Sequence, residues 1–150
     1  VWIAKRRSPY TGVPKSNHNA EANIVHHYFA GMAAGIIILQ AVIIAPSMAK
    51  TLDMKNFGVS IRVIWPKFFL MVLGTGIACL ASLIFADAAT LIQFLIAGLT
   101  AGLALVCYAI IPATNRATDR GDQETFKRLH LASVVSTVIT LVANIGFLFT

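Results

Sequence analysis

The fold is decided by residues 66–111, PKFFLMVLGTGIACLASLIFADAATLIQFLIAGLTAGLALVCYAII, in which two apolar stretches flank the short polar segment 87–90. Each stretch has about 20 residues, the length that a helix needs to cross the roughly 30 Å hydrocarbon core of a bilayer. A connection of this length joins neighbouring antiparallel helices. The sequence therefore predicts a transmembrane helical hairpin here.

Two further apolar stretches lie on either side of this hairpin. We predict four spans in total, at about 24–45, 66–86, 91–111 and 126–149. The predicted fold class is all-α: an antiparallel four-helix bundle in the membrane, which two tandem helical hairpins could build. Residues 1–22 are polar and contain Pro14, so we expect an extended tail outside the hydrocarbon, followed by one transmembrane domain at 23–150.

The composition agrees with a membrane protein. Of the 150 residues, 57% are hydrophobic and only 12% are charged, and the mean hydropathy is +0.76. A soluble domain of this size could not bury so much apolar surface. Cys79 and Cys107 lie in or near predicted spans without a CxxC pair, so we interpret both as packing residues.

Helix ends are predicted mainly from proline and from capping residues. We expect Pro46 to end the first helix, residues 47–65 to form a polar connection with a short interfacial helix, and Trp65-Pro66-Lys67 to open the second. Pro112 should end the third helix. Asp122 should cap the start of the fourth, since aspartate accepts hydrogen bonds from free backbone N–H groups.

The net charge of +6 reflects bases that flank the spans and form no nucleic-acid motif, so we expect no nucleic-acid partner. Cytoplasmic loops retain more Lys and Arg than translocated ones. The first and third connections carry twice as many bases as the tail, so we predict that the first and third loops are cytoplasmic and that both termini lie outside. The membrane is expected to be a bacterial inner membrane or an organelle membrane. The two sets are Lys50, Lys55, Arg62, Lys67, Arg116, Arg120, Lys127 and Arg128, against Lys5, Arg6, Arg7 and Lys15.

Polar residues inside a membrane are candidates for function, and helix direction assigns each to one face. The predicted polar cluster at one membrane face is His26, His27, Asp87, Gln93 and Asn144. The predicted set at the opposite face is His130, Asn115, Arg116 and Lys67.

Two histidines on different helices would suggest haem, but His27 and His130 should lie most of a bilayer apart and so cannot ligate one iron. We favour His27 over His26 as the histidine facing the bundle, because Gly31 and Gly35 share its helix face. Three roles for these histidines stay open. His27 or His26 could bind a cofactor together with another ligand, or His27 and Asp87 could share a proton or a metal ion. The third role is simple hydrogen bonding at the membrane interface.

Small residues predict where helices approach each other closely. Gly31 and Gly35 form one Gly-x-x-x-Gly pattern, and Gly98 and Gly102 form another. On the fourth span, Ser136, Thr140 and Asn144 recur every four residues. This polar stripe could line a wet path, or its side chains could hydrogen-bond to the helix backbone and a neighbouring helix.

Several short motifs resemble the transmembrane-protein-205-like family of four-helix membrane proteins, whose domain has no known function. They are Ala45-Pro46, Phe57-Gly58, Pro66, Ile111-Pro112 with Asn115, and the segment Phe126-Lys-Arg-Leu-His130 with Ser133. The resemblance implies that His27 and His130 match family histidines. The architecture is also similar to copper-resistance-D-like and protoporphyrinogen-oxidase-like membrane proteins, a likeness at the level of the fold.

The sequence supports no catalytic residue, because it contains no phosphate loop, nucleophile elbow or suitable acid pair. The favoured hypothesis is a non-enzymatic accessory or assembly subunit of a larger membrane complex, in contact with other subunits and the lipid bilayer. One alternative is a haem- or metal-dependent redox protein using His27, with haem or copper as the cofactor. Another is a small transporter or proton pathway along the polar stripe.

Overall fold

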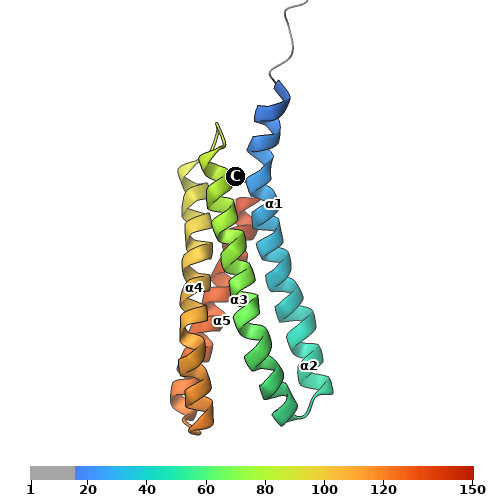
Figure 1. Ribbon diagram of the computed structural model, residues 1–150, viewed down its shortest axis with the longest axis vertical. Helices are drawn as coiled ribbons and strands as arrows, with labels where there is room; N and C mark the ends of the chain where they lie inside the picture. Colours follow the sequence, from blue (N-terminus) through green and yellow to red (C-terminus); the bar gives the residue numbers. More distant parts are fainter. Residues whose placement is uncertain (1–15) are drawn as a thin grey trace, which may run out of the picture.

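A computed structural model describes residues 16–150, with side chains described from Ile24 onward. The expected tail at 1–15 lies outside the described residues. The chain forms α1 (Ser16–Ile38), a π-helical turn η1 (Leu39–Ile44), α2 (Ala45–Thr51), α3 (Met54–Ile84), α4 (Leu91–Asp119) and α5 (Gln123–Phe147). Figure 1 shows these helices running side by side along one long axis, with the start of α1 and the C-terminus at the same end.

The expected all-α, antiparallel four-helix bundle is confirmed. Within the described part of the chain, four helices are long and apolar enough to cross a membrane: Ile24–Thr51, Met54–Ile84, Leu91–Asp119 and Gln123–Phe147. α3 packs on α4, α4 on α5, and α1 on both α3 and α5, so the bundle closes on itself. Many large apolar side chains point outward, as lipid-facing residues do.

Helix ends differ from the sequence prediction where proline was expected to terminate a helix. The first helix does not end at Pro46 but continues to Thr51, after a π turn in which the N–H of Ala45 bonds the carbonyl of Gln40. The wider turn shifts the hydrogen-bond register just before a residue that has no N–H.

Pro66 and Pro112 lie inside helices and not at their ends. α3 begins twelve residues before Pro66, so most of the expected connection at 47–65 is helical, and Trp65-Pro66-Lys67 is internal. α4 likewise runs on from Pro112 to Asp119. Residues 16–22, expected to be an extended tail, are helical and belong to α1. At the start of α1, the start of α3 and the end of α4, the helix thus extends beyond the predicted hydrophobic span.

The two connections after α3 and α4 follow the capping rules. Thr90 and Gln93 form a reciprocal capping box at the start of α4, directly after the predicted short connection. The prediction that Asp122 starts the last helix is confirmed, since its side chain accepts the N–H of Thr125 at 3.0 Å. Hydrogen bonds from Thr125 hold the pKa of Asp122 below its ordinary value, so this cap remains a carboxylate at neutral pH.

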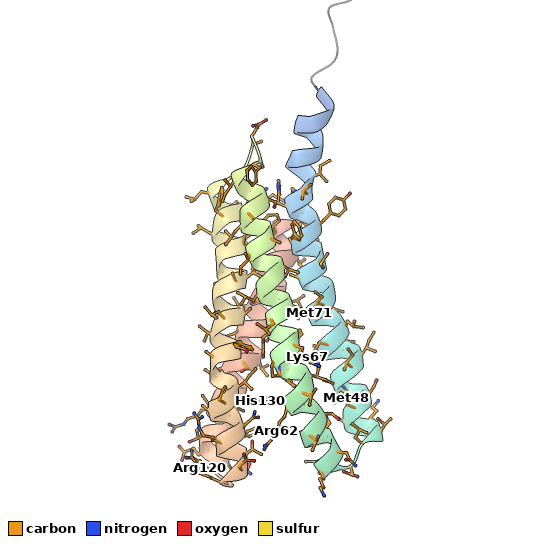
Figure 2. All side chains as sticks on the ribbon, in the orientation of Figure 1. Met48, Arg62, Lys67, Met71, Arg120 and His130 are labelled. Carbon is orange, nitrogen blue, oxygen red and sulfur yellow. The ribbon has the colours of Figure 1, made fainter. Side chains whose placement is uncertain are left out.

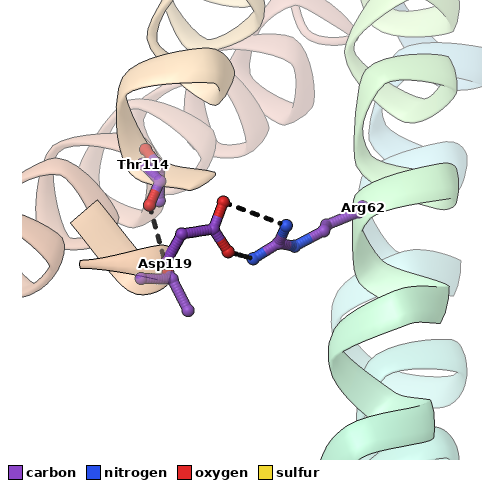
Figure 3. A network of polar contacts seen from close by, with 4 residues as sticks. Arg62, Thr114 and Asp119 are labelled. Atoms are coloured by element: carbon purple, nitrogen blue, oxygen red, sulfur yellow. Dashed lines mark hydrogen bonds and ion pairs between the residues drawn. The ribbon is translucent and has the colours of Figure 1, made fainter. Parts of the chain in front are cut away.

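The ends of α3 and α4 are also joined by charge. Arg62 on α3 and Asp119 at the end of α4 form an ion pair with two hydrogen bonds, one of which spans 3.3 Å. Figure 3 shows the paired groups bridging the two helices. The two terminal guanidinium nitrogens each donate to one carboxylate oxygen, a bidentate end-on arrangement that links the first part of α3 to the end of α4.

Candidate functional site: the histidine end of the bundle

Two of the polar residues predicted at one membrane face, His26 and His27, lie where α1 meets the end of α5. The imidazole rings of His26 and His27 are 4.4 Å apart between centroids. Both rings contact Phe147, the last residue of α5, at 5.8 and 5.4 Å. Phe147 is fully buried. The structure therefore joins two histidines of the first helix to an aromatic residue of the last.

The expectation that His27 rather than His26 faces the bundle is wrong. His26 is only 3% exposed, whereas His27 is half-buried. The reason is that the interior side of α1 is its alanine side, formed by Ala30, Ala33 and Ala34. His26 precedes Ala30 by four residues and so shares this side.

His26 has one buried atom without a partner. Its backbone carbonyl accepts the thiol of Cys79 on α3 at 3.5 Å, but its side-chain Nδ1 is buried and makes no hydrogen bond with any described residue. An unpaired buried polar atom costs roughly 1–3 kcal/mol. The buried, unpaired Nδ1 of His26 therefore lowers the stability of this end of α1 unless another group binds it.

The other members of the predicted cluster form separate contacts one layer away. The amide of Asn144 donates to Thr100 Oγ1 of α4 at 2.7 Å and to the carbonyl of Thr140 at 2.8 Å. Gln93 Nε2 donates to Thr150 Oγ1 at 3.3 Å. Asp87 is exposed, and no hydrogen bond connects it to a histidine in the described part of the chain. The sequence placed these residues at one end but did not resolve their pairing.

The polar stripe of α5 faces the interior. Thr140 and Asn144 are buried and Ser136 is half-buried. Thr140 Oγ1 donates to the carbonyl of Ser136 at 2.8 Å, so its hydroxyl is satisfied within its own helix. Ser136, Thr137 and Thr140 also line a cavity of about 10 Å³ at the centre of the bundle, beside Cys107. A cavity of this size holds about one water molecule.

The residues predicted at the opposite face are not joined to one another. His130 is exposed, stacks on Phe126 at 5.6 Å and meets Trp65 at 6.4 Å. In residues 24–150, no hydrogen bond or ion pair joins it to the other members of the set, which are Asn115, Arg116 and Lys67. His130 lies seventeen residues before Phe147, or about 25 Å along α5. His27 and His130 therefore cannot share one iron.

Sequence reasoning missed Phe147, Thr100 and Gly76. Phe147 could have been found, because it lies three residues beyond Asn144 and so continues the interior stripe of α5. Gly76 had no repeat to single it out, yet it makes the tightest contact of any described glycine: a Cβ there would lie 2.8 Å from the backbone N of Ala101. A metal-binding group of three or more His, Cys, Asp or Glu side chains is not found among the described residues.

The glycines predicted to pack closely do not do so within the chain. A Cβ added at Gly35, Gly98 or Gly102 would meet no atom within 4 Å, and one at Gly31 would meet only Leu148 at 3.9 Å. α3 and α4 approach instead at Gly76, where the missing side chain lets two backbones come together. Gly35 on α1 and Gly102 on α4 are exposed.

The lengths, apolar surfaces and packing of these helices define an integral membrane protein with a four-helix bundle. The chain belongs to the family of DUF4149, a domain of unknown function, which matches residues 28–123. This match extends from α1 to the first residue of α5, so it includes three of the four long helices. No curated protein and no solved structure matches the chain. The narrower resemblance to the transmembrane-protein-205-like family stays a prediction.

Proposed function

We propose that this protein is a non-enzymatic subunit of a larger membrane complex, and that a partner helix packs on the outer face of α4. The observation that carries this proposal is the open space in front of Gly98 and Gly102. Small-xxx-small patterns let two transmembrane backbones approach closely, and α4 does not use this one inside its own bundle.

The surface around these glycines has the shape that a partner helix needs. Leu95, Leu99 and Val106 are exposed along one side of the glycine row, at 59%, 40% and 54%, and Leu105 is exposed along the other side, at 53%. A helix seated over Gly98 and Gly102 would pack between these side chains. Dispersion contacts drive helix association in lipid, where the surrounding acyl chains are as apolar as leucine.

Filling the glycine row tests the proposal. We expect the wild-type protein to co-purify with one or more membrane proteins from native membranes in mild detergent, and Gly102→Leu to lose them while it folds normally. The control is Gly146→Leu on α5, which adds the same volume where a Cβ would also meet open space. Partner bands that are absent from the wild type, or that persist in Gly102→Leu, would refute the proposed interface.

The second candidate function is a haem- or metal-dependent redox protein, favoured by the unpaired Nδ1 of His26 beside His27. If His26 is structural, the His26→Leu variant should melt no lower than the wild type, because the change removes an unpaired buried polar atom. A visible absorption band or bound copper or iron in the purified wild type, lost in His26→Leu, would favour the redox candidate.

A further inference from the structure

The charges of the described residues gather at the end of the bundle opposite the histidines. The connections and helix ends there carry eight bases against four carboxylates, an excess of four positive charges. At the other end, Asp87 is the one Asp, Glu, Lys or Arg among residues 24–150. Figure 2 shows Arg62, Lys67 and Arg120 in the half of the bundle that also holds His130.

Each of the four carboxylates already has a partner. Asp119 pairs with Arg62, and Glu124 pairs with Arg128. Asp53 accepts two hydrogen bonds from Asn56, from its backbone N at 2.8 Å and from Nδ2 at 2.9 Å, and Asp122 caps α5. Six bases in the described part of the chain are left without an ion pair: Lys50, Lys55, Lys67, Arg116, Arg120 and Lys127.

Lys67 differs from the other five in its depth. Twenty residues of α3, counted back from Ile84, end at Trp65, which places Lys67 at the edge of a hydrocarbon core of about 30 Å. The lipid phosphates begin at this level. An ammonium here has either water at the interface or a phosphate oxygen as its partner.

The helix face above Lys67 is apolar and open. Met71, one turn further along, is 56% exposed, and Gly74 and Ala81 on the same side are exposed as well. From Lys67 to Ala81 this face is about 21 Å long, more than the roughly 15 Å half-thickness of the hydrocarbon. It offers an acyl chain a continuous surface that begins at a positive charge.

We propose that Lys67 and the apolar face of α3 above it bind an anionic phospholipid, with the lipid phosphate on the ammonium and one acyl chain along Met71 and Gly74. The combination of charge and apolar length selects a lipid over a soluble anion, which would use the charge alone. The unpaired charge of Lys67 and the excess of bases around it select an anionic headgroup over a zwitterionic one.

Native mass spectrometry of the full chain, released from nanodiscs with equal amounts of phosphatidylglycerol and phosphatidylcholine, tests this proposal. We expect the wild type to retain phosphatidylglycerol severalfold more than phosphatidylcholine, Lys67→Gln to lose that preference, and Lys67→Arg to keep it. The matched control is Arg128→Gln, which removes one charge from the same end but from a base that already has a partner.

Three outcomes would overturn the proposal. They are equal retention of the two lipids by the wild type, unchanged preference in Lys67→Gln, and an equal loss in Lys67→Gln and Arg128→Gln, which would indicate bulk charge. Inorganic phosphate in excess should not displace the bound lipid. Displacement by phosphate would be a fourth contrary outcome, because it would show that the site selects the phosphate group and that the acyl chain adds nothing to binding.

Discussion

Replacing Gly76 with leucine is expected to lower the melting temperature of the detergent-solubilised protein by about 10 °C. A Cβ at this position would lie 2.8 Å from the backbone N and 3.1 Å from the Cα of Ala101, so α3 and α4 must move apart to admit any side chain. Overpacking of this kind costs roughly 1–3 kcal/mol or more, and each kcal/mol shifts the midpoint by roughly 2–4 °C in a chain of this size.

Gly102→Leu is the matched control, because it makes the same change on α4 where a Cβ would meet no atom within 4 Å. We expect its melting temperature to equal or exceed that of the wild type, since leucine favours a helix more than glycine does. Equal melting temperatures for Gly76→Leu and Gly102→Leu would contradict the close approach of α3 and α4 at Gly76.

Phe147→Ala should destabilise the histidine end by about 3 kcal/mol, the lower end of the range for truncating a buried phenylalanine. Phe147 is fully buried and contacts both His26 and His27, so its loss leaves a cavity between α1 and α5. Thermal unfolding in detergent measures the effect. Labelling of Cys79 by a membrane-permeant maleimide should also become faster, because Cys79 is buried in the same core cluster as Phe147 and the cavity opens beside it.

Phe149→Ala provides the comparison for this second experiment. Phe149 lies two residues further along the chain and is 85% exposed, so its truncation removes little packing. We expect its melting temperature and its Cys79 labelling rate to match those of the wild type. Equal destabilisation by the two truncations would contradict the packing of Phe147 against the histidines.

Much of the fold could be predicted because hydrocarbon imposes strict conditions on a chain. Backbone groups in a bilayer must be hydrogen-bonded internally, so apolar stretches of about 20 residues become helices. The short polar segment Asp87–Thr90 then fixes two of them as antiparallel neighbours. The helix ends were harder to predict, because Pro46, Pro66 and Pro112 all lie within longer helices whose neighbouring turns retain their hydrogen bonds.

For the candidate site, the position of each residue along its helix could be predicted, but the side of the helix that faces the bundle could not. Counting residues along each helix placed His26, Gln93 and Asn144 at one end and His130 at the other, because the rise per residue is constant. The side of α1 that faces the bundle was misjudged, since the glycine row at Gly31 and Gly35 and the alanine row at Ala30 and Ala34 are equally small. Both rows permit close packing, and only the positions of α3 and α5 choose between them.

The sequence by itself therefore determined four antiparallel membrane helices from residues 66–111 and the apolar stretches around them. It also predicted that His26 and Asn144 lie toward one end of the bundle and His130 toward the other. Only the tertiary structure decided which faces meet: Gly76 against Ala101, His26 inward against Phe147, and Gly98 and Gly102 outward. The physical reason is that hydropathy and helical rise act along a single helix, whereas rotation about its axis is set by the shapes of its neighbours.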